Sequence, residues 1–241
     1  MVFGVGPRQA AAQSASQLGA WDGLMLSPVG ALAPVARDPG AIASGANELS
    51  LRYGRWRYDV EDAVHDNIGL TFTHSFGFAR TQVALTGVYG LVECPTCSGW
   101  ELGGVDLQSI LWNWGFAGAH GRPITAGVGL RVSLGGARNR GPDASTAVSA
   151  AIAVPIDIAL PFKKTSSLCA SIVPGFGFGS IASTDVAESG FLPMIGAAVA
   201  WNITSAFGVD LGVQRIIIVG GPTQVGAALS WRFGSHRDIR P

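Results

Sequence analysis

Residues 224–233, with the sequence QVGAALSWRF, alternate strictly between two kinds of side chain. One face carries Val225, Ala227, Leu229, Trp231 and Phe233, and the other carries Gln224, Gly226, Ala228, Ser230 and Arg232. A period of two over ten residues predicts a β-strand that is apolar on one face only. Because the same alternation recurs from residue 47 onwards, the chain is restricted to an all-β fold.

The composition decides which solvent the apolar face meets. Charged residues make up 13% of the 241 residues, about half of the roughly 25% found in soluble domains. The sequence contains no run of about 18 apolar residues, so it predicts no transmembrane helix. The competing fold is a soluble β-sandwich or barrel, whose polar face would be rich in Lys and Glu. Here that face is mostly Gly, Ala, Ser and Thr, which suits a narrow lumen inside a lipid-embedded barrel.

Ten strands are expected, an even number as bacterial barrels require. The predicted ranges are 47–58, 67–76, 80–92, 99–112, 123–134, 146–160, 166–178, 191–202, 207–218 and 224–233. Most connections at the end where the barrel begins and finishes are short, apart from 113–122, and those at the opposite end are longer. This pattern is typical of periplasmic turns and extracellular loops. We therefore predict a closed antiparallel transmembrane β-barrel.

Aromatic residues sort to the two ends of this topology, as expected for rings at the two lipid–water interfaces. At the periplasmic end the predicted belt contains Phe76, Phe78, Trp112, Trp114, Phe116, Phe162, Trp201, Phe207, Trp231 and Phe233. At the outer end it contains Trp56, Tyr58, Tyr89, Trp100, Phe176, Phe178 and Phe191.

Four regions follow from these patterns. Residues 1–14 resemble the remnant of a signal peptide in the small residues of Ala10–Ser14, although they lack an apolar core. Residues 15–46 form an irregular segment, broken by Pro28, Pro34 and Pro39, which could plug the lumen. Residues 47–233 form the barrel, and residues 234–241 a periplasmic tail.

The last strand resembles the C-terminal assembly signal of bacterial outer-membrane β-barrels. Gln224, Gly226, Leu229 and Trp231 match its spacing, and Phe233 adds the terminal aromatic residue, although here the chain continues to Pro241. The resemblance implies a small porin-like protein of the outer membrane of a Gram-negative bacterium. It also implies insertion by the barrel assembly machinery and contact with the lipid bilayer and lipopolysaccharide.

A second resemblance lies in residues 30–44. Asp38-Pro39 and Ala41-Ile42 are similar to the segment before the first strand of the long-chain fatty-acid transporter family, although that family's next residues are absent and its barrel has more strands. This likeness implies an N-terminal plug within the lumen and the passage of hydrophobic molecules.

Several charged residues are placed on the lumen face, where buried charges must pair or coordinate a ligand. A turn near residues 220–221 would bring Asp210 opposite Trp231, and hence beside Arg232, which predicts an Asp210–Arg232 ion pair. These charges could simply fill the interior or could line a selective polar pathway. The predicted lumen charges are Glu48, Arg52, Glu101, Asp106, Arg131, Asp157, Asp210 and Arg232.

Other reactive residues offer weaker patterns. Asp62, His65 and Asp66 in the first outer loop could bind a cation or act as an acid–base pair, but a solvated acidic loop is the simpler interpretation. Cys94 and Cys97 are expected to close a small disulfide in another outer loop. We predict no catalytic residue, metal ion or cofactor, and the zero net charge without a basic stripe argues against nucleic-acid binding.

The leading hypothesis for function is a non-enzymatic barrel that forms a narrow or plugged conduit for small or hydrophobic solutes. One alternative is a structural or adhesive surface protein that acts through its outer loops, and another is a hydrolase or protease at the barrel rim. The sequence contains no signal for the oligomeric state.

Overall fold

The computed structural model describes residues 36, 46–57, 64–78, 81–93, 99–118, 122–141, 145–163, 165–182, 187–218 and 221–234. Three sequence predictions therefore lie outside the described residues: the remnant of a signal peptide at 1–14, the Cys94–Cys97 disulfide and the tail after Gly234. Most of segment 15–46 and the acidic loop residues 58–63 also lie outside them.

The described chain is built of antiparallel strands that follow the predicted alternation closely. The strands are β1 (Asn47–Arg57), β2 (Val64–Phe78), β3 (Thr81–Glu93), β4 (Trp100–Phe116), β5 (Ile124–Asn139), β6 (Thr146–Ala153), β7 (Ile156–Pro161), β8 (Ser167–Ala182), β9 (Ala187–Asn202), β10 (Phe207–Ile216) and β11 (Thr223–Phe233). The described residues include no helix that is long and apolar enough to cross a membrane.

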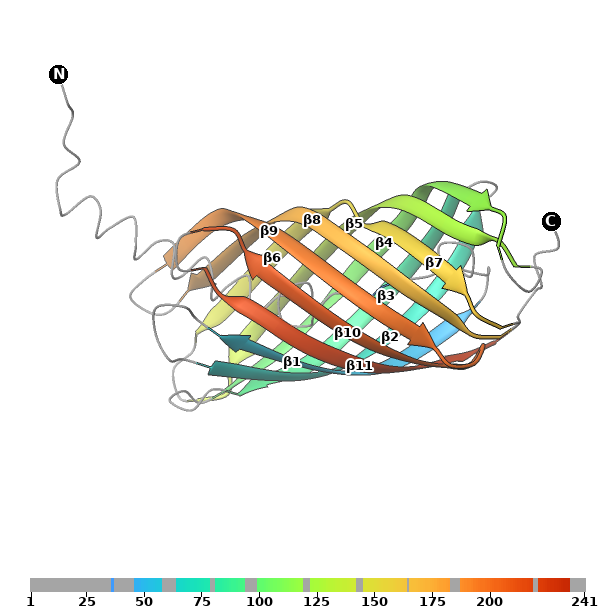
Figure 1. Ribbon diagram of the computed structural model, residues 1–241. Coiled ribbons are helices and arrows are strands. Elements are labelled where there is room, and N and C mark those ends of the chain that lie inside the picture. The colour runs from blue at the N-terminus through green and yellow to red at the C-terminus, as the bar shows by residue number, and fades with distance from the viewer. Residues whose placement is uncertain are drawn as a thin grey trace, which may run out of the picture.

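Apart from β6 and β7, strands that are consecutive in sequence pair with each other, and β1 pairs with β11 to close the ring (Figure 1). Strands β6 and β7 each pair with both β5 and β8, so together they occupy one place in the barrel wall. The predicted closed barrel of ten strands is therefore confirmed. We call the end where β1 starts and β11 finishes the inner end, and the opposite end the outer end.

Pro155 explains why one predicted strand is split into β6 and β7. Proline has no N–H to donate to a neighbouring strand, so it interrupts the ladder. The wall nevertheless stays closed, because the Val154 N–H donates to the Pro174 carbonyl and the Gly129 N–H to the Pro155 carbonyl, each at 2.9 Å. A side chain at Gly129 would approach the Ser109 backbone oxygen within 2.4 Å, so this tight packing requires glycine.

The β4–β5 hairpin projects beyond the inner end of the wall. The register shifts between Ile110 and Trp112, and residues 111–116 are exposed on both faces of β4. The sequence predicted β4 to end at residue 112 and left 113–122 as an unusually long connection. In the structure residues 113–116 of this connection continue β4 and pair with the start of β5, because a β-bulge allows an antiparallel pair to bend and extend.

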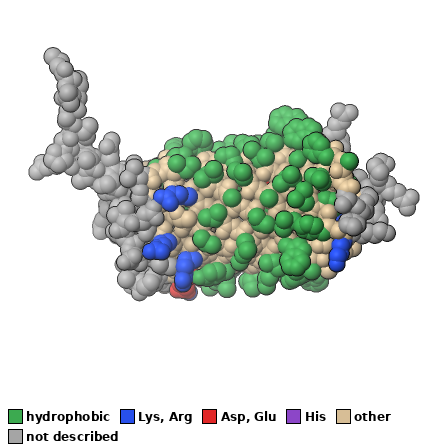
Figure 2. Space-filling view, viewed as in Figure 1, with side chains coloured by type: hydrophobic (Ala, Val, Ile, Leu, Met, Phe, Trp, Pro, Cys, Tyr) green, Lys and Arg blue, Asp and Glu red, His purple; other side chains and the backbone are tan. Residues whose placement is uncertain are grey.

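The exterior of the barrel is apolar along the middle of every strand, and charged side chains gather towards its ends (Figure 2). The inner aromatic belt is confirmed by exposed Phe76, Trp112, Trp114, Phe116, Phe162, Trp201, Phe207, Trp231 and Phe233. At the outer end Tyr89, Phe176 and Phe191 are exposed as predicted.

The predicted exterior positions of two residues of the outer belt are wrong. Trp56 is only 1% exposed and Trp100 only 9%, and both lie in apolar clusters inside the barrel. The reverse holds for Glu101, which was expected in the lumen but pairs with the exposed Arg138 at the outer rim. In each case the residue follows the alternation of its strand, because β1 and β4 present their odd-numbered residues outwards.

Candidate functional site

The lumen holds a buried ion pair between neighbouring strands at mid-height. Arg131 on β5 donates from Nε to both carboxylate oxygens of Asp106 on β4, at 2.9 and 3.0 Å. The Ser133 hydroxyl donates to the same carboxylate. Asp106 lies opposite Ser133 in the register, so the pairing of β4 with β5 brings all three side chains together. A desolvated ion pair needs such additional hydrogen bonds to offset the cost of burial.

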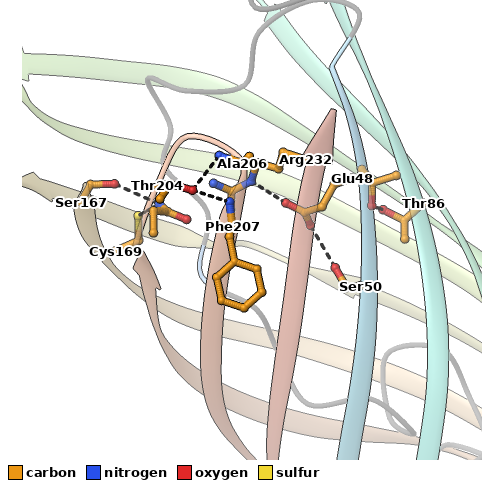
Figure 3. A network of polar contacts seen from close by, with 11 residues as sticks. Glu48, Ser50, Thr86, Ser167, Cys169, Thr204, Ala206, Phe207 and Arg232 are labelled. Atoms are coloured by element: carbon orange, nitrogen blue, oxygen red, sulfur yellow. Dashed lines mark hydrogen bonds and ion pairs between the residues drawn. The ribbon is translucent and has the colours of Figure 1, made fainter. Parts of the chain in front are cut away.

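A second ion pair lies at the inner end, where β1 and β11 close the barrel (Figure 3). Arg232 donates from Nε to Glu48 at 2.8 Å, and the Ser50 hydroxyl donates to the other oxygen of Glu48 at 3.3 Å. Glu48 lies directly opposite Arg232 in the register, which explains the contact.

The predicted geometry of the Asp210–Arg232 pair is wrong. The structure places Asp210 opposite Ala228 and Trp231 opposite Phe207, a register that differs by three residues from the predicted one. The difference arises because the β10–β11 connection is centred nearer residue 219 than 220–221. Asp210 still interacts electrostatically with Arg232, although the ion pair is formed by Glu48.

The other predicted lumen charges face inwards as expected. Arg52, Asp157 and Asp210 are all buried, and each makes polar or electrostatic contacts. They share the middle and inner lumen with buried hydroxyl and amide groups. These polar neighbours are Ser50, Thr71, Thr73, Ser75, Thr86, Gln108, Ser133, Ser167, Ser171, Asn202 and Ser230.

The outer part of the lumen contains large apolar side chains beside the buried amides of Asn67, Gln214 and Gln224, which the sequence analysis did not predict. Two clusters of buried side chains occupy the outer halves of their strands, and together we call them the outer apolar lumen. One consists of Trp56, Ala151, Leu192, Met194 and Ile216 with Ile218 packed against it. The other consists of Val88, Val92, Trp100, Leu102, Ala137 and Ala147 with Ile181.

Trp56 gives the first of these clusters a polar group. Its indole Nε1 is buried and has no hydrogen-bond partner among the described residues. A buried N–H of this kind favours an acceptor that reaches it. The outer apolar lumen is therefore suited to an apolar molecule that carries a hydrogen-bond acceptor.

Ala36 is the one described residue of the segment before residue 46, and it lies inside the barrel. It is 1% exposed and belongs to a cluster with Ala159, Cys169, Ala198 and Ala200, which line the inner lumen on β7, β8 and β9. The small side chains of this wall leave room for a backbone that passes close to it. Cys169 is buried there as a free thiol.

The first outer loop shows no acid–base pair among its described residues. His65 and Asp66 are consecutive on β2 and therefore point to opposite faces of the wall. Asp66 faces outwards, where it accepts two hydrogen bonds from Arg55 and one from Tyr53. Across the part of the chain that the structure describes, no group of three potential metal ligands occurs.

The exterior and the lumen together decide the class of protein. In lipid, only a closed barrel gives the backbone of every strand hydrogen-bond partners on both sides. An apolar exterior band between aromatic belts, together with small and polar groups in the lumen, is the arrangement of a lipid-embedded barrel. The structure is that of an outer-membrane β-barrel. Strands of this kind are found in the outer membrane of Gram-negative bacteria, which gives the location of this protein.

No family model and no curated protein sequence matches the chain. Among solved structures, the chain is similar to an outer membrane channel from Pseudomonas putida F1, at 14% identity and a TM-score of 0.43, over 82% of this chain and 100% of the other. It is also similar to the N-terminal β-barrel domain of Pseudomonas aeruginosa OprF, at 12% identity and a TM-score of 0.36, over 79% and 98% of the two chains. A third similar structure is Ail, the attachment invasion locus protein of Yersinia pestis, at 13% identity and a TM-score of 0.34, over 79% and 100%.

Proposed function

We propose that this barrel is a narrow conduit for small hydrophobic solutes, which it takes up from the outer side. The observation that carries the proposal is the outer apolar lumen. Large apolar side chains line the part of the lumen that faces the medium, where a water-filled porin would carry polar groups. Apolar surface at this position favours solutes that gain free energy by leaving water.

The position of Ala36 supports a lumen that is gated rather than open. A residue from the segment before the barrel packs on the small side chains of the inner wall, including Cys169 and Ala200. The polar wall around it is also closely packed, since Thr71, Thr73 and Ser133 are each 1% exposed. A solute that crosses the inner lumen would therefore displace residues that now occupy it.

The proposal is tested by comparing two kinds of solute in a Gram-negative host that expresses the full chain. Uptake of an apolar naphthylamine dye should rise relative to cells without the barrel. Hydrolysis of nitrocefin by a periplasmic β-lactamase, which reports the passage of a hydrophilic solute, should not change. Equal increases for both solutes would indicate an open pore. No increase for the dye would leave a structural or adhesive role as the better account.

Substitutions at Met194 provide the matched comparison within the outer apolar lumen. Met194→Gln keeps the length of the side chain but adds an amide, whose burial without a partner costs about 1–3 kcal/mol. We expect it to lower dye uptake by roughly tenfold, as a cost of about 1.4 kcal/mol would. Met194→Leu should leave uptake unchanged. Equal uptake by the two variants would contradict a role for this apolar surface.

A further inference from the structure

Trp56 brings a hydrogen-bond donor into the apolar part of the lumen. It is the last lumen-facing residue of β1 at the outer end. Its side chain belongs to one buried cluster with Leu192 and Met194 on β9 and Ile216 on β10. The residue is 1% exposed, and its indole N–H has no acceptor among the described residues. Because an indole donates a hydrogen bond and accepts none, an acceptor is the group that this position lacks.

The wall directly below Trp56 is formed by glycine. One step nearer the middle of the barrel, the register places Gly226 on β11 opposite both Gly54 on β1 and Gly212 on β10, and all three face the lumen. These three strands are neighbours in the wall (Figure 1). Glycine inside a strand is found where a ligand or another backbone approaches the wall closely. The row therefore allows a ligand to approach the wall beside the Trp56 indole.

The residues around the glycine row bound this position. Gln224 and Gln214 lie in one row with Trp56 on the outer side, and both make interactions of their own. On β9 the glycine row continues as Ala198, which lies opposite Gly212 and belongs to the cluster of Ala36. A solute at the glycine row would thus lie beside the segment that packs on the inner wall.

The donor and its surroundings select the chemistry of the solute. The cluster around Trp56 consists of apolar side chains, so a charged group placed there would be buried at a high cost. A hydroxyl or amide group would bring a hydrogen of its own that also needs an acceptor. A carbonyl oxygen on an apolar body accepts the indole hydrogen and brings no donor.

We propose that Trp56 determines the specificity of the conduit by donating its indole N–H to the carbonyl oxygen of an uncharged apolar solute, such as a ketone, an ester or a lactone. The carbonyl group approaches the wall at Gly54 and Gly226, and the apolar body lies against the outer apolar lumen. The inference rests on the proposed function and names the class of solute that the conduit prefers.

The test uses the full chain in lipid nanodiscs and compares two probes of the same shape. The first, 2-acetylnaphthalene, has a carbonyl oxygen where the second, 2-isopropenylnaphthalene, has a CH2 group. Equilibrium dialysis measures the binding of each, and empty nanodiscs correct for partition into lipid. A buried hydrogen bond raises affinity about fivefold, so Trp56→Phe should lower the ratio of the two affinities by about that factor. Trp112→Phe, which changes an exposed tryptophan on the exterior, should leave the ratio unchanged.

Two further measurements make the test independent of that variant. The carbonyl stretching band of bound 2-acetylnaphthalene should lie at a lower frequency than in empty nanodiscs, because a hydrogen bond weakens the C=O bond. The anion 2-naphthoate should bind more weakly than 2-acetylnaphthalene, although His65 lies opposite Trp56 in the register. A gel-mobility shift on heating confirms that each variant is folded.

The outcomes separate this inference from the proposed function. An equal ratio in the wild type and Trp56→Phe, a carbonyl band at its frequency in lipid, or tighter binding of 2-naphthoate would each overturn the role of Trp56. Those results would leave the conduit for apolar solutes in place. If neither uncharged probe binds to the wild type, the outer apolar lumen takes up no apolar solute, and both the proposed function and this inference are overturned.

Discussion

The outer part of the lumen and its middle and inner part share one wall but are filled in opposite ways. The outer part packs large apolar side chains such as Trp56 and Leu192, whereas the rest pairs charges such as Asp106 and Arg131. Both sets occupy the same face of the strands, so alternation alone determines which residues enter the lumen but not what they do there. We infer that the barrel is stabilised from inside by apolar packing at the outer end and by ion pairs in the middle and at the inner end.

The largest effect should come from breaking the buried ion pair at mid-height. Asp106→Ala leaves the Arg131 guanidinium, whose side chain is 9% exposed, without its carboxylate. Loss of one partner of a buried pair costs about 3–5 kcal/mol. We expect the free energy of unfolding, measured by urea titration of the barrel in detergent, to fall by about that amount.

The double variant D106L/R131M is the control for this prediction. It removes both charges and replaces them with apolar groups, so it should recover most of the lost stability. If the double variant lost as much free energy of unfolding as Asp106→Ala, the ion pair itself would stabilise the barrel beyond the cost of leaving Arg131 unpaired. A loss below about 1 kcal/mol in Asp106→Ala would contradict the assignment of this pair as buried.

The outer apolar lumen should respond to loss of volume instead of loss of charge. Leu192→Ala removes buried methyl groups from the cluster around Trp56 and should lower the free energy of unfolding by about 3 kcal/mol. Leu211→Ala on β10 is the matched control, because Leu211 is 62% exposed on the exterior. If both variants lose the same stability in the urea titration, the cluster is not packed as described.

A smaller effect is expected at the inner end of the lumen. Glu48→Gln removes the charge that pairs with Arg232 but leaves an amide oxygen able to accept its hydrogen bond. The Arg232 side chain is 24% exposed, so water can solvate part of its charge. The cost should be about 1–2 kcal/mol in the same titration. A loss as large as that of Asp106→Ala would show that the two pairs do not differ in solvation.

Much of the fold could be predicted from the sequence because the alternation is local. The number and order of the strands in the wall and the aromatic belt at the inner end follow from the order of apolar and small residues, whereas several strand ends do not. The lumen positions of Trp56 and Trp100 were missed, although the signal was present. Leu51 and Val105 set the outward face of their strands, and the parity of residues 56 and 100 places them on the other.

The contacts of the lumen were harder to predict because they depend on register between strands. Asp106 and Arg131 meet only because β4 pairs with β5 around a long hairpin that contains a bulge. The predicted register of Asp210 opposite Trp231 was wrong because a shift of three residues in one connection changes every pairing along β10 and β11. Connections lacking a distinctive turn motif do not fix such a register.

The central claim is that hydrophobic solutes pass through a lumen in which residue 36 lies against the inner wall. The variant A36C/C94S/C97S tests it directly, because the new thiol joins Cys169 in one cluster and can be linked to it by oxidation. The account predicts that oxidised cells lose the uptake of the apolar dye and that reduction restores it. Uptake that is unchanged when the disulfide has formed would contradict passage through the lumen.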